Sequence, residues 1–288
     1  MEKDPNYLAD LTWPEVQAAL QRTDLAIIPV GSVEQHGHHL PLGTDFIGAM
    51  SLARAAAKRT GAIVAPAIFP GISEHHMAFP GTLTLSAETF VRVLMEVAQS
   101  LIRHGFRKIL LVNGHGGNET TMRYVADRIN RETEAMAAVF GIQELRKVYL
   151  TDRADKMDVH AGYGETAIVM HLAGQLIDRQ RIRKPTMRLG PNRARTLSKV
   201  KDDATWFPFA MLKLPATHTV TDTGSITFLD PKDATPDVGR QMFEKFVDEL
   251  VAFVERWQAA YPPAERPVRR VLPRPARPGE KKDKGGAR

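Results

Sequence analysis

The 288-residue chain contains no cysteine. This absence excludes disulfides, thiolate nucleophiles and thiolate metal ligands, so any bound metal ion must be held by nitrogen and oxygen donors. Long apolar runs are lacking as well, because none approaches the roughly 18 residues that a bilayer-spanning helix requires. Residues 1–10 have the charge pattern of neither a signal peptide nor a transit peptide. These absences predict a soluble, cytoplasmic protein without a membrane partner.

Most of the chain carries no excess of positive charge. The formal net charge is +6, but residues 262–288 hold nine basic and three acidic residues, and the other 261 residues carry 30 of each sign. This segment also contains six of the 19 prolines and almost no large apolar residues, a composition that does not offset the entropy cost of ordering. We therefore expect one domain over residues 1–261 and a disordered basic tail over residues 262–288. The composition leaves open a non-enzymatic role in which the tail binds nucleic acid or another anionic surface.

Apolar runs typical of strands alternate with helical patterns along the chain. This alternation predicts an α/β fold with a mainly parallel sheet. The strands are expected at residues 25–30, 63–68, 108–112 and 137–142. The helices are expected at residues 46–58, 87–104, 119–131, 164–174 and 235–259. Ser86 is expected to cap the second of these helices and Gly105 to end it.

Candidate metal ligands are concentrated in the loop after the first expected strand. In open α/β sheets, ligands bind outside the carboxyl ends of the strands, so a site is expected in such loops. Glu34 and His36 lie two residues apart, and in an extended segment their side chains project to the same side. Asp45 follows a turn that contains glycine and proline, and its two carboxylate oxygens can bridge two ions.

A second loop, residues 113–118, is rich in glycine and contains His115. Its small residues let the backbone and the imidazole approach a crowded site closely. A single histidine is more often structural than functional. Residues 31–45, however, contain five histidine or carboxylate candidates, and together with His115 they favour a metal site.

Three stretches of the sequence resemble the creatininase (creatinine amidohydrolase) family, namely residues 34–45, 76–82 and 113–118. The resemblance extends over about residues 7–260. It implies a three-layer α/β/α fold, a homohexamer, and hydrolysis of amide-type bonds at two divalent ions bridged by an aspartate. Zinc, manganese and iron all suit carboxylate and imidazole ligands, so the residues do not select among them.

The resemblance also implies a ligand set. By motif position, Glu34 and His115 would bind one ion, His36 the other, and Asp45 both. The creatinine-hydrolysing branch of the family has a ligating glutamate two residues after the second-loop histidine, where this chain has Gly117. The second ion would therefore be left short of a carboxylate, which argues against a true creatininase.

Glu165 is the expected replacement for that carboxylate. It lies in residues 160–166, which resemble the His-Ala-Gly…Glu-Thr motif of the branch whose second loop reads Asn-Gly-His-Gly-Gly-Asn. With Glu34 and Asp45 it would supply three negative charges against the four positive charges of two dications. One metal-bridging hydroxide would bring the site to neutrality, and that hydroxide is the expected nucleophile. The alternative is that Glu165 only complements a helix dipole in a first turn.

Four further residues near the motifs are candidates for the site. His160 is a candidate catalytic residue that would pass a proton to the leaving nitrogen, or else a hydrogen-bond partner of a ligand. His39 is a candidate for substrate binding with a similar structural alternative. Ser73 and His76 precede a Phe-Pro-Gly-Thr turn and would contact the substrate, or else only order the loop. No role is assigned to His38.

The substrate is left open between a small cyclic amide, a formamide and a peptide-like amide. Residues 179–201 hold nine basic residues that could receive a phosphate, as deformylation of a formylaminopyrimidine nucleotide would require, or form a solvated surface. Ring opening of a cyclic ketone is a further alternative within the family. Trp206, Phe207 and Phe209 are expected to lie in an aromatic loop.

Overall fold

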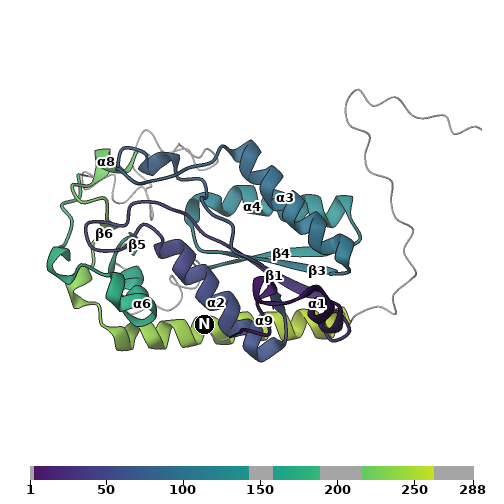
Figure 1. Cartoon of the computed structure of the whole chain (residues 1–288). Coiled ribbons are helices and arrows are strands. Elements are labelled where there is room, and N and C mark those ends of the chain that lie inside the picture. The colour runs from purple at the N-terminus through teal and green to yellow at the C-terminus, as the bar shows by residue number, and fades with distance from the viewer. Residues whose placement is uncertain (1–2, 143–157, 189–215, 263–288) are drawn as a thin grey trace, which may run out of the picture.

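The computed structural model describes residues 3–142, 158–188 and 216–262 of the chain (Figure 1). The expectations for the basic tail beyond residue 262 and for the aromatic loop at Trp206, Phe207 and Phe209 therefore lie outside the described residues. The same holds for the part of the basic stretch that extends from residue 189 to residue 201.

The sheet in the described part of the chain has four parallel strands in the order β2-β1-β3-β4. These strands are β1 (Leu25–Val30), β2 (Ile63–Val64), β3 (Lys108–Asn113) and β4 (Met136–Gly141). All residues of the two central strands, β1 and β3, are buried. Such continuous burial is typical of a parallel strand that is covered on both faces, which explains why these strands read as unbroken apolar runs.

Helices cover both faces of the sheet (Figure 1). One face packs against α3 (Ala87–His104) and α4 (Glu119–Glu132), whose apolar residues share a buried cluster with alternate residues of β1 and β3. The other face packs against α2 (Thr44–Thr60) and α9 (Pro236–Ala260). The helix α6 (Tyr163–Ala173) lies against both α2 and α9. The expected three-layer α/β/α architecture is confirmed.

Local sequence signals account for the ends of α3. The Ser86 hydroxyl accepts a hydrogen bond from the Thr89 backbone N–H at 3.2 Å, as expected of an N-cap. Gly105 follows the last turn with φ of 116°, a left-handed conformation that favours glycine. The other expected helices begin and end within two residues of their predicted bounds.

Two expectations for the strands need correction. The strand expected at residues 63–68 pairs as a regular strand only over Ile63–Val64. Pro66 has no backbone N–H and interrupts the ladder, which resumes as a single bridge between Ile68 and Val30. The last strand of the sheet, expected at residues 137–142, begins and ends one residue earlier.

Several short elements were not expected from the sequence. They include α1 (Trp13–Ala19), β5 (Asp158–His160), α8 (Thr217–Val220) and β6 (Ile226–Thr227). The strands β5 and β6 form a small antiparallel pair that places His160 beside the first loop. Among the helices of the described ranges, none combines the length and the hydrophobicity that crossing a bilayer requires.

The loops after β1 and β3 lie side by side at the carboxyl end of the sheet. The Gly114 N–H donates to the carbonyl of Val30 at 2.8 Å, which ties the two strand ends together. A Cβ atom on Gly114 would lie only 2.3 Å from the Asp45 carbonyl oxygen. Only glycine therefore fits at this point, where β3 passes the first turn of α2 and brings the two candidate loops into contact.

Candidate metal centre

Glu34 lies at the centre of a group of polar side chains at this end of the sheet. Its side chain is fully buried. One carboxylate oxygen, Oε2, accepts hydrogen bonds from the hydroxyls of Ser73 at 2.6 Å and Ser32 at 2.9 Å. The other oxygen, Oε1, has no hydrogen-bond partner in the described part of the chain. A fully buried carboxylate with a free oxygen is costly unless a cation or donor is supplied to it.

Asp45 stands in the first turn of α2 between two imidazoles. Its Oδ1 lies 3.2 Å from His36 Nε2, and its Oδ2 lies 3.1 Å from His115 Nδ1. The second approach does not have hydrogen-bond geometry, and Oδ2 is another buried oxygen without a hydrogen-bond partner among the described residues. His115 Nε2 lies 3.2 Å from Glu34 Oε2, so one imidazole spans both carboxylates.

Glu165 approaches the same group from the first turn of α6. Its Oε2 accepts a hydrogen bond from the backbone N–H of Ala161 at 2.5 Å and lies 3.8 Å from His36 Nε2. Ala161 has φ of 49°, a left-handed conformation that an alanine rarely adopts and that aims its N–H at the carboxylate. The backbone therefore holds Glu165 toward the other candidate ligands, in addition to any effect of the helix dipole.

These side chains form overlapping sets with metal-ligand spacing. Glu34, Asp45 and His115 each offer an atom within 4.8 Å of the others, and so do His36, Asp45 and Glu165. Asp45 belongs to both sets, as the family resemblance implies. A third set joins Glu34 and His36 to His160. Two of the three carboxylates have a buried oxygen without a hydrogen-bond partner among the described residues. Three carboxylates this close repel one another, and divalent cations would offset that repulsion.

Hydrogen bonds to backbone carbonyls orient the two candidate imidazole ligands. His36 Nδ1 lies 3.1 Å from the carbonyl of Glu34, and His115 Nε2 lies 3.0 Å from the carbonyl of Ile72. A carbonyl only accepts, so each of these nitrogens carries the proton. The opposite nitrogen of each ring, which faces Asp45, is then free to bind a cation.

Without a bound cation, protons on the imidazoles offset the negative charge of the carboxylates. Burial alone would lower the pKa of His36, but the carboxylates of Asp45, Glu165 and Glu34 raise it to about 9. Burial likewise opposes the charge of His115, and Glu34 and Asp45 hold its pKa well above the usual range. The pKa values of both carboxyls stay low in return, despite burial. The site is therefore built to keep its carboxylates ionised and to attract positive charge.

The remaining predicted residues are also placed by the structure. His160 Nδ1 and His76 Nε2 lie 3.6 Å and 3.4 Å from the free Oε1 of Glu34. Ser73 is buried against the same carboxylate rather than facing open space.

His39 Nε2 lies 2.8 Å from the Thr166 hydroxyl, one residue beyond Glu165. His38, which was given no role, is exposed.

Two residues near the carboxylates were not expected from the sequence. The side chain of Gln35 lies within hydrogen-bond distance of both His76 and His160. The ring of His75 stacks on the ring of His115, with centroids 5.7 Å apart and an interplanar angle of 9°. An extended segment would point Gln35 away from its neighbours. Gly37, with φ of 66°, shows that the loop is turned instead.

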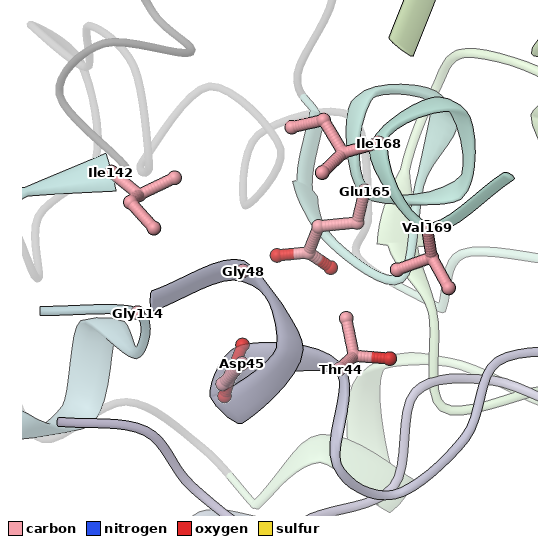
Figure 2. Close-up of a pocket in the computed structure, with 8 residues that line it drawn as sticks. All are labelled: Thr44, Asp45, Gly48, Gly114, Ile142, Glu165, Ile168 and Val169. Carbon is pink, nitrogen blue, oxygen red and sulfur yellow. The ribbon is translucent and has the colours of Figure 1, made fainter. Parts of the chain in front are cut away.

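A small cavity of about 30 Å³ adjoins the carboxylates of Asp45 and Glu165. Figure 2 shows Glu165 pointing from α6 toward α2, with Ile142, Ile168 and Val169 around the same space. The cavity is large enough for a water-sized group, and its walls are mainly apolar. An apolar wall behind two carboxylates lowers the local dielectric and strengthens their attraction for a cation.

Comparisons with known proteins show what this chain is similar to. A family model described as creatinine amidohydrolase, named Creatininase, matches residues 9–254. The chain is 30% identical over 256 residues to the mycofactocin precursor peptide peptidase of Mycobacterium ulcerans (strain Agy99), covering 85% of this chain and 86% of that protein. It is 29% identical over 199 residues to the creatinine amidohydrolase of Pseudomonas putida, covering 61% and 75%. A solved structure of a mutant creatininase of Zn-Zn type superposes with a TM-score of 0.72 at 23% identity, covering 91% of this chain and all of that one.

Proposed function

Because the chain belongs to the creatininase family, we propose that it is a metal-dependent amidohydrolase that cleaves the C–N bond of an amide. The observation that carries this proposal is the convergence of Glu34, Asp45 and Glu165 on two imidazoles, with carboxylate oxygens left without hydrogen-bond partners among the described residues. Bound divalent ions would supply Lewis-acid polarisation of the amide carbonyl and an activated water at neutral pH. We propose two such ions, with zinc and manganese as the first candidates and iron as another.

The residues of this chain divide into ligands and proton carriers in this proposal. Glu34 and His115 would hold one ion, His36 and Glu165 would hold the other, and Asp45 would offer a carboxylate oxygen to each. The three carboxylates balance most of the charge of two dications. Glu165 takes the place of the carboxylate that Gly117 cannot supply.

His160 Nδ1 lies 3.6 Å from Glu34 Oε1. It is close enough to take up the proton that the activated water loses and to pass it to the leaving nitrogen. His76 and His39 flank the ligands and are proposed to contact the substrate. For Ser73, whose hydroxyl is already bonded to Glu34, the geometry favours orienting that carboxylate over contacting the substrate.

Peptide-like amides are the first substrates to test. The aligned share of this chain is larger for the mycofactocin precursor peptide peptidase than for the creatinine amidohydrolase. The glutamate of the creatinine-hydrolysing branch is replaced by Gly117. Cyclic amides and formamides, including formylaminopyrimidine nucleotides, and cyclic ketones belong in the same screen as competing classes.

The test combines metal analysis with turnover. Protein purified without chelator is expected to contain about two divalent ions per chain, and the reconstituted enzyme to hydrolyse at least one amide of the screen. Glu34→Gln should abolish turnover and lower the metal content. Glu132→Gln, an exposed change on α4, is the matched control and should alter neither. Less than about one ion per chain, or full turnover in Glu34→Gln, would overturn the proposal.

Further proposals concern the whole chain. We propose that residues 1–261 suffice for catalysis, that the enzyme acts in the cytoplasm, and that it assembles as a homohexamer, as the resemblance implies. Truncation after Tyr261 should preserve turnover. If the tail binds anionic surfaces, truncation should remove binding to an anionic vesicle or a DNA duplex without changing kcat. Light scattering of the full chain tests the hexamer.

A further inference from the structure

We infer that Gln35 is a positioning residue. Its side chain sets His76 as a proton donor toward the free oxygen of Glu34, and its backbone carbonyl sets His160 as a proton acceptor beside that oxygen. The inference goes beyond the proposed ligand set and deepens it, since its catalytic consequence rests on the proposed amide hydrolysis.

Two backbone groups fix which way the Gln35 amide points. The Gly37 N–H donates to Gln35 Oε1 at 3.0 Å, and an N–H group can face only an acceptor. The Gly224 carbonyl lies 3.1 Å from Gln35 Nε2, and a carbonyl can face only a donor. The oxygen and the nitrogen of the amide are thus assigned without reference to any histidine.

The backbone carbonyl of Gln35 fixes the proton on His160. Its Nε2 lies 2.7 Å from the backbone carbonyl of Gln35, so this nitrogen must carry a proton and donate it. It cannot also accept from Gln35 Nε2, although the two nitrogens lie 2.9 Å apart. A neutral His160 therefore presents a lone pair at Nδ1, the atom that lies 3.6 Å from Glu34 Oε1.

His76 then receives the second hydrogen of the Gln35 amide. One hydrogen goes to the Gly224 carbonyl, and the other goes to His76 Nδ1 at 2.8 Å, because His160 cannot accept it. With Nδ1 accepting, a neutral His76 carries its proton on Nε2, which faces Glu34 Oε1 at 3.4 Å. The two rings, with centroids 4.3 Å apart, thus present one donor and one acceptor to the same place.

This arrangement has a use in amide hydrolysis. Amide hydrolysis needs one group that takes up a proton and another that donates a hydrogen bond, each held in a fixed position beside the reacting atoms. An imidazole in the wrong tautomer presents a donor where an acceptor is needed, or the reverse. None of these contacts joins Gln35 to the free carboxylate oxygen or to the amide of a substrate. Gln35 acts through His76, while its backbone carbonyl acts through His160.

A double-mutant cycle tests the connection through His76. Gln35→Met keeps the length of the side chain and removes its donors. We expect kcat on the amide that the screen identifies to fall about 100-fold, with KM changed less than about threefold and the metal content intact. In a His76→Ala background, the same change should alter kcat by less than about twofold, because the backbone carbonyl that orients His160 is still present. Gln241→Met, an exposed change on α9, is the control for an added methionine.

Equal losses in the two backgrounds would overturn the inference, as would wild-type kcat in Gln35→Met. A second measurement needs neither turnover nor a variant. ¹⁵N-histidine NMR of the zinc-reconstituted full chain should report His76 and His160 both protonated on Nε2, and a proton on His76 Nδ1 would refute the assignment. If the wild-type enzyme hydrolyses no amide in the screen, the proposed function fails, while the tautomers are still read directly from the spectrum.

Discussion

Gly117 lies where a side chain has no room. A Cβ atom there would stand 2.4 Å from His115 Nε2 and 2.4 Å from the Ile72 carbonyl oxygen, the pair whose hydrogen bond orients the imidazole. The glutamate that the family resemblance implies for the creatinine-hydrolysing branch therefore cannot be accommodated on this backbone. Gly117→Ala is expected to displace His115, lowering kcat/KM at least about tenfold and stability by about 1–3 kcal/mol. Gly116→Ala is the adjacent control, because no described atom would lie within 4 Å of a Cβ atom added there.

The outcome is read from kinetics and elemental analysis of both variants. Full metal content and activity in Gly117→Ala would show that His115 does not depend on the small residue beside it. A loss in Gly116→Ala of the same size would point to the flexibility of the loop rather than to contact with the imidazole.

Lys108 and Asp24 form a buried ion pair away from the candidate metal centre. Lys108 Nζ lies 2.9 Å from both carboxylate oxygens, and Lys108 is 2% exposed. Lys108→Met would leave a buried carboxylate without its cation, which is expected to cost about 3–5 kcal/mol in the free energy of unfolding. The exposed pair of Arg59 with Asp248 is the control, since Arg59→Met should cost less than about 1 kcal/mol.

Urea denaturation measures both variants. Adding Asp24→Asn to Lys108→Met should recover much of the loss, because the double variant no longer buries an unpaired charge. If Lys108→Met alone cost no more than Arg59→Met, the pair would contribute nothing beyond a surface contact.

Single residues also show what the sequence can and cannot predict about the site. Glu34, His36, Asp45 and His115 were expected because two strand-end loops concentrate ligating side chains, and the structure brings them together. Gln35 was not expected, since alternation along an extended segment would turn it away. The turned loop that brings it inward depends on contacts with residues about 40, 125 and 189 positions away, which no local pattern encodes.

At the scale of the elements, the crossing of α6 and α9 depends on Gly239. A Cβ atom at this position would lie 1.8 Å from the Ala167 carbonyl oxygen, which belongs to the backbone and cannot rotate away. Gly239→Ala is therefore expected to destabilise the protein by about 1–3 kcal/mol although alanine is the better helix former. Gly48→Ala in α2 is the matched helical control, where the nearest described atom is Ile142 Cδ1 at 3.7 Å. That change should be neutral or stabilise by up to about 1 kcal/mol.

Thermal and urea unfolding of the two variants decide the point. A Gly239→Ala variant as stable as Gly48→Ala would mean that α6 and α9 can separate at little cost. Because Glu165 stands in the first turn of α6, a true displacement of this helix should also reduce metal content, which gives an independent readout.

Elements were predictable where a local signal decides them. Ser86 and Gly105 bound α3 as expected because capping and left-handed φ are properties of single residues. The strand expected at residues 63–68 was too long because its apolar run outweighed Pro66, whose missing N–H interrupts the ladder. The capping box of Thr12 and Glu15 marks the start of α1 and is a local signal from which this helix could have been predicted. The pair β5 and β6 joins residues 66 and 69 positions apart and has no comparable local signature.

For the whole molecule, folding and metal binding are expected to be coupled. Three carboxylates from the loop after β1, from α2 and from α6 meet at one point, so the elements that carry them are held together more firmly when cations are bound. An ion present at about 1,000 times its Kd adds about 4 kcal/mol to the stability of the folded state. For a chain of this length, the loss of one such ion should then lower Tm by about 10 °C, and chelation should lower it by at least this much.

Differential scanning calorimetry with and without EDTA measures the shift. Glu165→Gln should show a smaller response to chelator than the wild-type chain, and Glu132→Gln should respond like the wild type. An unchanged Tm after verified metal removal would contradict the coupling of the carboxylates to the fold.

The chelated protein is also expected to depend on pH in a way that the metal-loaded protein does not. The nearby carboxylates raise the folded-state pKa of His36 to about 9 against burial, compared with an ordinary value of 6.5. A raised pKa contributes stability that is fully present below the unfolded value and is lost as the pH rises through the folded value. Glu34 and Asp45, with depressed pKa values, remain ionised over this window. The free energy of unfolding of the chelated chain should thus fall between about pH 6.5 and 9.5, by on the order of 3 kcal/mol from His36. In the metal-saturated chain, cations replace the protons, and the fall in the free energy of unfolding over this pH range should be much smaller. Urea titrations at the two pH values measure it, with the exposed change His104→Gln as control. Equal pH dependence in both forms would show that the imidazoles do not neutralise the carboxylates when the ions are absent.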